Sequence, residues 1–241
     1  MDDEIDQLLK SLGLHRMREV FDREITRATK TKASYRDLVA ALLREQHAWQ
    51  RQRSFEYRIK VSRVPERWSL DTFPFDQQPG VEPAVIKQLG ELDFVPKAEN
   101  LVFIGPTGVG KTGLAIGILL RALENGCRGL FISAQDLFDE MLTSLADKST
   151  RKLLNHLRAV DVLLIDEMSY LTLRPEQTNI FFRLMEERYG RKSTIITTNL
   201  DYDDWYGFLG RKEMVGALLD RLRHRCTTIR IDGPSLRRPS S

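Results

Sequence analysis

Hydrophobic positions divide the chain into a helical first part and a second part in which short apolar runs alternate with helical patterns. Up to about residue 70, apolar residues recur every three or four positions, and no run has the alternation of a strand. A break is expected at Gly13, and Ser34 followed by Asp37 predicts the start of a helix. The pattern therefore predicts a small all-helical domain over residues 1–70.

Residues 71–100 are rich in proline and glycine around one short helical stretch. Such punctuation is typical of a connector between domains. Phe73 and Phe75 lie in it, and we expect both rings to pack against the protein rather than to stack on nucleic-acid bases.

From residue 101 to 241 the pattern predicts an α/β domain. Runs rich in Val, Ile and Leu between helices indicate a buried parallel sheet that is covered on both faces. Strands are expected at 101–104, 129–133, 161–168, 193–199 and 227–231. Helices are expected at 110–125, from about 134, from Pro175 to near Gly190, and at about 211–224.

Composition excludes several classes of protein. The chain has 241 residues, 41% apolar and 29% charged, which is ordinary for a soluble globular protein. Its net charge of +3 says little about nucleic acid. Cys127 and Cys226 lie in no paired spacing, so neither a disulfide framework nor a zinc site is expected, which fits a reducing cytoplasm. The acidic start does not predict a secretory signal, and the apolar runs are too short to cross a bilayer.

The residues between the first expected strand and its helix match the pattern G-x-x-x-x-G-K-[ST]. Glycines allow a tight turn, and main-chain N–H groups at a helix N-terminus attract anions, so this pattern predicts a phosphate cradle. Lys111 would reach the β- and γ-phosphates, and the Thr112 hydroxyl would bind Mg²⁺. The loop expected to hold a nucleotide consists of Gly105, Pro106, Thr107, Gly108, Val109, Gly110, Lys111, Thr112 and Gly113.

Two further expected strands end in polar residues that would complete such a site. The run "VLLIDE" delivers Asp166 and Glu167 to the C-terminal edge of the sheet, where ligands of open α/β folds collect. Asp166 is expected to hold the metal ion, directly or through water, and Glu167 to orient and deprotonate the attacking water. Asn199 could position this water, although a turn-forming Asn after a strand is a common alternative.

Two basic segments are candidates for a nucleic-acid surface. In the first, cations and aromatic residues interleave, which suits phosphate backbones and equally fits a solvated helix face. In the second, hydroxyls and cations lie at the expected junction of two helices, where a solvated turn is an equal alternative. The candidates are Arg51, Arg53, Arg58 and Lys60 in the first segment, and Lys148, Thr150, Arg151 and Lys152 in the second. Neither set indicates base-edge recognition, so a weak sequence preference is expected.

The order of these motifs resembles that of the AAA+ ATPases. The succession "GPTGVGKT", "LLIDEMSYL", "TTN" and "LLDRLRHRC", with the helical first part and "FPFD", is similar more closely to the IstB-like transposition helper ATPases of bacterial insertion sequences. Relatives of that family are the DnaC-type helicase loaders and DnaA. The resemblance runs from about residue 5 to 237. It implies a cytoplasmic bacterial ATPase that uses ATP and Mg²⁺ and forms a homo-oligomer with nucleotide at subunit interfaces on double-stranded DNA. It also implies recruitment or stimulation of a DDE-type transposase of the same element for target selection.

The resemblance implies a further catalytic residue. In such ATPases an arginine of one subunit reaches the nucleotide of its neighbour, and Arg221 in "LLDRL" matches that position. The expected catalytic residues are then Lys111, Glu167, Asn199 and Arg221.

Three features depart from the family pattern. Gly113 stands where the family often has a bulkier residue, and Leu236 replaces the aromatic of the usual G-x-S-Y-R tail, which leaves the role of Arg237 open. Few residues follow the last expected helix, so a C-terminal lid domain is not expected.

Two other functions remain as alternatives. A P-loop kinase for a small molecule would need an acceptor pocket and lid, which the sequence does not suggest. A nucleotide-gated adaptor such as a DnaC-type helicase loader shares nearly all of the AAA+ motifs, and the N-terminal part should distinguish it. GTP is disfavoured because no N-K-x-D pattern occurs.

Overall fold

The computed structural model describes residues 3–210 and 212–237, which divide into two units between Tyr57 and Arg58. The first unit contains helices α1 (Asp3–Ser11) and α2 (His15–Thr31) and most of α3 (Tyr35–Val61). The Ser34 Oγ accepts a hydrogen bond of 3.2 Å from the Asp37 N–H, which caps the start of α3 as the sequence predicts. The helical N-terminal region is thus confirmed, and the division between units falls inside α3 rather than at residue 70. Its core is Leu9, Met17, Val20 and Leu42.

The second unit begins with short helical segments and then forms a sheet. The connector residues form the 3-10 helices η1 (Leu70–Thr72) and η2 (Phe75–Gln77) and helix α4 (Pro83–Gly90). Phe73 is buried against the sheet's core, and its ring meets that of Phe75 edge to face, with centroids 4.8 Å apart. The connector is therefore an integral layer of this unit.

Five parallel strands form one sheet in the order β2-β3-β4-β1-β5, which confirms the predicted α/β class. The three inner strands β3, β4 and β1 are almost wholly buried, as a sheet covered on both faces requires, whereas the edge strand β5 is largely exposed. The strands are β1 (Asn100–Ile104), β2 (Gly129–Ser133), β3 (Val162–Met168), β4 (Ser193–Thr198) and β5 (Cys226–Arg230).

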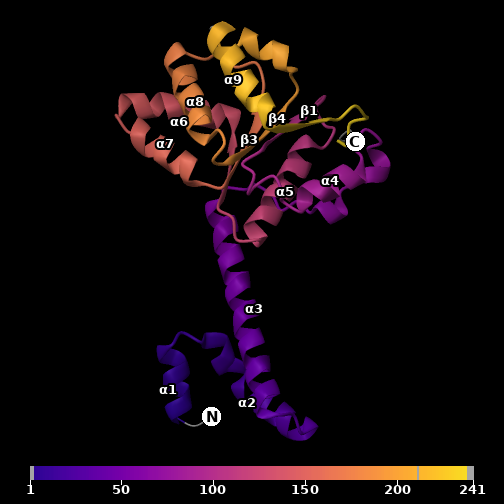
Figure 1. Ribbon diagram of the computed structural model, residues 1–241, viewed down its shortest axis with the longest axis vertical. Helices are drawn as coiled ribbons and strands as arrows, with labels where there is room; N and C mark the ends of the chain where they lie inside the picture. Colours follow the sequence, from indigo (N-terminus) through magenta and orange to yellow (C-terminus); the bar gives the residue numbers. More distant parts are fainter. Residues whose placement is uncertain (1–2, 211, 238–241) are drawn as a thin grey trace. The chain divides into compact units, whose positions relative to one another are not determined.

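Helices cover both faces of this sheet and enclose two apolar cores. Helix α5 (Lys111–Glu124) and α4 lie on one face, and the other long helices lie on the opposite face (Figure 1). The helices on the opposite face are α6 (Ala134–Ala146), α7 (Thr150–Ala159), α8 (Pro175–Arg188) and α9 (Lys212–His224). The short 3-10 helix η3 (Tyr202–Gly207) lies between β4 and α9 in the chain. Helices α5, α6, α8 and α9 match predicted helical stretches within a few residues, and α7 is the second of the two helices expected to meet near residue 150. The 3-10 helix η3 was not predicted. Residue 211, where the last helix was expected to begin, lies outside the described residues.

The strand order decides where polar residues can meet. Strands β3, β4 and β1 are neighbours, so the residues that follow their C-terminal ends share one edge of the sheet. That edge carries the glycine-rich loop after β1, the Asp166–Glu167 pair at the end of β3, and Asn199 after β4. Within the described residues, none of the helices is long and apolar enough to span a bilayer.

Candidate active site

The glycine-rich loop between β1 and α5 adopts the conformation that its sequence predicts. Gly108 and Gly110 have φ of 88° and 95°, a region that favours glycine because a Cβ would clash with the backbone. Gly110 caps the N-terminus of α5, so the first main-chain N–H groups of that helix face the loop. The Val109 side chain is buried in the core, which leaves only its main chain for a ligand.

Lys111 begins α5 and its side chain lies along the loop. Its Nζ donates hydrogen bonds of 2.7 Å to the carbonyl oxygens of Gly105 and Pro106. A lysine ammonium has three donors, so these two bonds leave one for a phosphate oxygen. Half-burial lowers the pKa of Lys111, while the charges of Asp166 and Glu167 oppose that shift. A cation that is partly desolvated attracts a polyphosphate more strongly than an exposed one.

Asp166 at the end of β3 is a buried carboxylate held by two hydroxyls. Its Oδ1 accepts hydrogen bonds from Thr112 Oγ1 at 2.9 Å and from Thr197 Oγ1 at 2.5 Å. Only 6% of Asp166 is exposed, and this burial raises the pKa of its carboxyl group, against the effect of the two hydroxyls. The carboxylate and the Thr112 hydroxyl thus lie together, as sequence reasoning predicted for a pair of magnesium ligands.

Glu167 is exposed beside Asp166 in a strained conformation. Its φ is 58°, which a residue with a side chain adopts at a cost of about 1–2 kcal/mol. The pairing of β3 with β4 shifts register between Ile165 and Met168, and the Glu167 N–H donates to Thr197 Oγ1 at 2.9 Å. One threonine hydroxyl therefore fixes both acidic residues, and the irregular strand end turns Glu167 away from the core.

Lys111, Glu167 and the two hydroxyl partners of Asp166 line one cavity of about 520 Å³. Its polar part is formed by Thr107, Gly108 and Gly110 of the loop and by Lys111, Thr112, Glu167, Ser169, Thr197, Thr198 and Asn199. The structure therefore brings together the predicted loop, Glu167 and Asn199. Thr197, which the sequence analysis did not single out, contacts both acidic residues because its strand β4 lies next to β3.

The rest of the cavity wall is mostly apolar, and its residues come from the beginning and the end of the second unit. Trp68, Phe73 and Pro74 precede β1, and Leu236 follows β5. The Leu236 N–H donates to the Gly108 carbonyl oxygen at 2.8 Å, and Gln78 Nε2 donates to the carbonyl oxygens of Val109 and Pro234. The tail therefore lies against the glycine-rich loop and brings Arg237 to the cavity wall, a contact that sequence reasoning left open.

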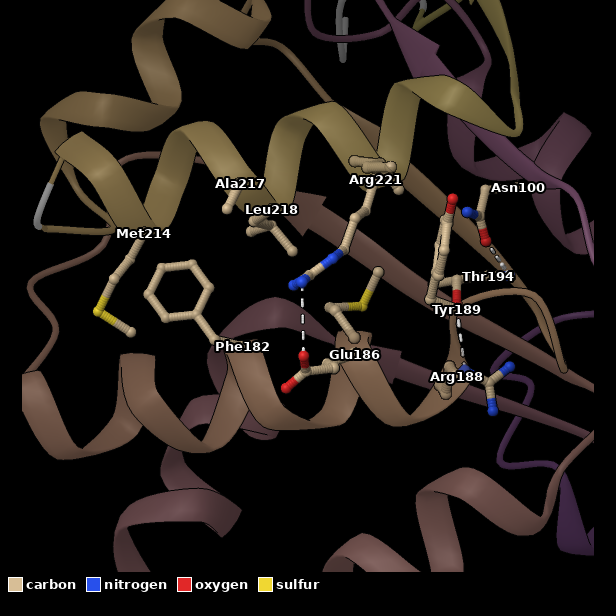
Figure 2. Close-up of a pocket in the computed structure, with 12 residues that line it drawn as sticks. Asn100, Phe182, Glu186, Arg188, Tyr189, Thr194, Met214, Ala217, Leu218 and Arg221 are labelled. Atoms are coloured by element: carbon tan, nitrogen blue, oxygen red, sulfur yellow. Dashed lines mark hydrogen bonds and ion pairs between the residues drawn. The ribbon is translucent and has the colours of Figure 1, made fainter.

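Arg221 lies on α9 and lines a different cavity, of about 160 Å³, between α8 and α9. Figure 2 shows its guanidinium reaching across this groove to Glu186 on α8. The Arg221 Nη2 and Glu186 Oε1 atoms are 3.5 Å apart, and both side chains are largely exposed. Within one chain Arg221 is thus accessible at the surface and separate from the residues around Lys111.

The basic residues predicted to bind nucleic acid differ in their surroundings. Arg58 Nε donates to the Leu123 carbonyl oxygen at 2.6 Å, and Thr150 Oγ1 donates to the Ser144 carbonyl oxygen at 3.0 Å, so both take part in the fold. The Arg53 guanidinium lies over the ring of Trp49 at 4.8 Å. Arg51, Lys60, Lys148, Arg151 and Lys152 are exposed.

Comparison with known proteins points to a family of ATP-binding proteins. A family model described as IstB-like ATP binding protein matches residues 7–241. An insertion sequence IS21 putative ATP-binding protein of Pseudomonas aeruginosa is 34% identical over 234 residues, which cover 97% of this chain and 88% of the relative.

Solved structures share the architecture of the second unit. The crystal structure of DnaI matches 69% of this chain and 92% of its own, with a TM-score of 0.60 and 22% identity. The crystal structure of the DnaC helicase loader matches 62% of this chain and 88% of its own, with a TM-score of 0.54 and 25% identity. The likeness to DnaI concerns the fold alone.

Proposed function

The chain belongs to the family of IstB-like ATP-binding proteins, and on that premise we propose that it is an ATPase that assembles on double-stranded DNA and assists a transposase. The observation that carries the proposal is the cluster at one edge of the sheet. There Lys111 lies on the glycine-rich loop, Thr112 Oγ1 is 2.9 Å from Asp166 Oδ1, and Glu167 stands beside them.

The loop and its helix bind the phosphates of ATP. Main-chain N–H groups at the start of α5 surround the β-phosphate, and Lys111 neutralises charge on the β- and γ-phosphates. Thr112 and Asp166 offer a hydroxyl and a carboxylate oxygen, the hard donors that Mg²⁺ takes together with phosphate oxygens. Mg²⁺ held there would offset the negative charge that develops on the phosphates.

Hydrolysis then needs a base and a positioned water. Glu167 accepts a proton from water as the water oxygen forms a bond to the γ-phosphorus and the bond from that phosphorus to the ADP oxygen breaks. Asn199 lines the same cavity and orients the water. The strained backbone at Glu167 holds its carboxylate in the cavity without burying it.

Arg221 acts on the nucleotide of a neighbouring subunit. It lies on a different groove from Lys111, and it is accessible at the surface of its own chain. An arginine placed against the developing phosphate charge can contribute about 10³–10⁵ in rate. The assembly is therefore a homo-oligomer with nucleotide at the subunit interfaces.

Mixing two inactive variants tests this arrangement. Arg221→Ala keeps Glu167 but lacks the arginine for its neighbour, and Glu167→Gln has the reverse defect. Each alone should hydrolyse ATP at least a hundredfold more slowly, whereas the mixture should recover activity because some interfaces combine both intact residues. Phosphate release by the single variants and the mixture is the measurement.

Arg223→Ala is the matched control, since Arg223 lies on the same helix over the ring of Tyr202. It should hydrolyse ATP normally. A mixture that stays inactive would remove Arg221 from the neighbour's site, and normal turnover by Glu167→Gln would remove Glu167 from the chemistry.

DNA binding is proposed for the start of α7, where Arg151 and Lys152 are exposed. Reversing both charges should weaken binding to DNA of any sequence and lower the salt dependence of log K by about one per residue, because phosphate contacts release counterions. Fluorescence anisotropy at several salt concentrations measures this. Reversal of the exposed Lys87 and Arg191 is the control, and equal losses from both pairs would reduce the effect to net charge.

A helicase loader of the DnaC type is the second candidate, because the second unit shares that fold. The family model includes most of the first unit, whereas the solved loader matches 62% of the chain, so the transposition role is favoured. The partner is then a DDE-type transposase of the same element. Co-purification with that transposase on DNA, against a replicative helicase as competitor, distinguishes the two roles.

A further inference from the structure

The apolar part of the cavity beside the glycine-rich loop contains one aromatic side chain that the core does not cover. Trp68 is 45% exposed, whereas Phe73 next to it in the cavity wall is 8% exposed. A tryptophan offers a large apolar surface, and leaving it open to water is unfavourable. An open indole in the wall of a cavity is suited to a flat apolar ligand.

The ring of Trp68 lies against the first turn of α5, the same turn that carries Lys111 and Thr112. A Cβ added at Gly113 would lie 3.4 Å from Trp68 Cε3 and 3.5 Å from Cδ2. The absent side chain at Gly113 therefore leaves the space that the indole occupies. A larger side chain at Gly113 would have to displace the ring.

Phe73 and Leu236 complete the wall on the glycine-rich loop itself. A Cβ at Gly110 would lie 2.7 Å from Phe73 Cε2 and 3.1 Å from Leu236 Cδ1, so both side chains press on the loop. Three apolar side chains, two that precede β1 and one that follows β5, thus border the loop and the start of α5. Phosphates bound at the helix start would direct the rest of a nucleotide along this wall.

Two of the cations that precede Trp68 form contacts within the protein, which favours a ligand other than nucleic acid at its ring. Arg58 donates to the Leu123 carbonyl oxygen, and Arg63 Nη1 lies 2.6 Å from Glu140 Oε1. Two cations of the basic segment that precedes Trp68 are therefore engaged within the second unit.

We propose that Trp68 is the residue on which the base of the nucleotide stacks, in space provided by Gly113. The inference rests on the proposed ATP site and names its base-binding element. Recognition through the ring face favours purines over pyrimidines, because a purine offers the larger stacking surface. Affinity for the base then depends on Trp68, and affinity for the phosphates on the loop.

Binding of three probes separates these contributions. For the full-length chain, calorimetry with ATP, CTP and inorganic triphosphate, each with Mg²⁺, should rank ATP above CTP and CTP above triphosphate. Trp68→Ala should weaken ATP about tenfold or more and leave triphosphate affinity unchanged, and Trp68→Phe should restore most of the loss. Stacking should also quench tryptophan emission, and the quench should vanish in Trp68→Phe and persist in Trp49→Phe.

A second variant tests the contribution of Gly113. Gly113→Val should weaken ATP in the wild-type background and add no further loss in Trp68→Ala, because the ring that it displaces is then gone. Additive losses would overturn the pairing of these residues.

Other outcomes also decide the matter. If the wild type binds ATP and triphosphate equally, or if Trp68→Ala weakens both alike, Trp68 does not hold the base although the phosphate site stands. If Trp68→Ala weakens DNA binding and spares ATP, the ring belongs to a DNA surface. If the wild type takes up neither ATP nor triphosphate, the proposed function itself fails.

Discussion

Two buried charged side chains lie at opposite ends of the neighbouring strands β3 and β4, and they differ in their hydrogen-bond partners. Near the N-terminal ends lies the guanidinium of Arg188, which is 1% exposed. It donates to the carbonyl oxygens of Leu157, Val160 and Ser193 and to Thr194 Oγ1. Near the C-terminal ends Asp166 is held by the hydroxyls of Thr112 and Thr197, which line the cavity of Lys111.

Burial acts on both groups but has different consequences. It lowers the pKa of Arg188 to about 10, against the attraction of Asp161, and it raises the pKa of Asp166. The four acceptors around Arg188 join α7, α8 and β4, so this charge serves the fold. Asp166 has fewer partners than a buried carboxylate can accept, so it keeps capacity for a cation. A buried charge whose hydrogen-bonding groups all have partners in the protein indicates a structural role. A buried charge that lacks some partners and lies near a cavity indicates a binding site.

Asp166→Asn should give the largest effect on activity. The amide keeps an oxygen acceptor for Thr112 and Thr197 but removes the charge that would hold Mg²⁺, so ATP hydrolysis should fall a hundredfold or more. The free energy of unfolding should stay equal or rise, because the buried charge is unfavourable in the folded chain. Phosphate release and urea unfolding of the same preparation measure the two. A clear loss of stability would make Asp166 a structural charge like Arg188.

The pH dependence of stability sharpens this test. A carboxyl whose pKa is higher in the folded than in the unfolded state favours folding while it is protonated. That contribution is fully present below the unfolded pKa and is lost as pH rises through the folded pKa. The stability of Asp166→Asn relative to the wild type should therefore increase from pH 4 to pH 7. A constant difference would mean that burial does not raise the pKa of Asp166.

Arg188→Met should give the largest effect on stability. Methionine fills part of the space but leaves three buried carbonyl oxygens without their donor, which should cost about 3–5 kcal/mol of unfolding free energy. Urea unfolding followed through the fully buried Trp205 measures it. Arg183→Met is the control, since Arg183 is exposed on the same helix in an ion pair with Glu187 and should change stability by about 0.5 kcal/mol or less. If Arg188→Met lowers the free energy of unfolding by less than about 1 kcal/mol, Arg188 does not have the structural role that distinguishes it from Asp166.

Sequence patterns predicted the features that depend on neighbouring residues along the chain. Buried strands are short apolar runs, and the conformation of the glycine-rich loop follows from Gly108 and Gly110, so the sheet and the loop could be predicted. The Asp166–Glu167 pair could be placed because strand β3 delivers it to a known edge of the sheet.

Features that depend on distant contacts could not be predicted. Trp68, Leu236 and Arg237 reach the loop through packing between segments far apart in the sequence. Arg188 stands in a charged stretch that fits a solvated helix face equally well, and only the fold shows its burial. The division between the two units falls inside α3, where helical periodicity continues without a break.

Glu186→Ala should give the smallest effect on stability and activity. It removes the partner of Arg221, which is accessible at the surface, whereas Arg188 is buried. The exposed Arg221–Glu186 pair contributes about 0.5 kcal/mol or less, so stability should hardly change. If the pair competes with the neighbour's nucleotide for Arg221, hydrolysis should rise by about twofold at limiting protein concentration, where assembly is incomplete. Turnover across a range of protein concentrations measures it, with Glu213→Ala on the exposed side of α9 as control. A fall in hydrolysis comparable with that of Arg221→Ala would instead mean that Glu186 positions Arg221 for its neighbour, and both ends of the pair would then belong to the catalytic interface.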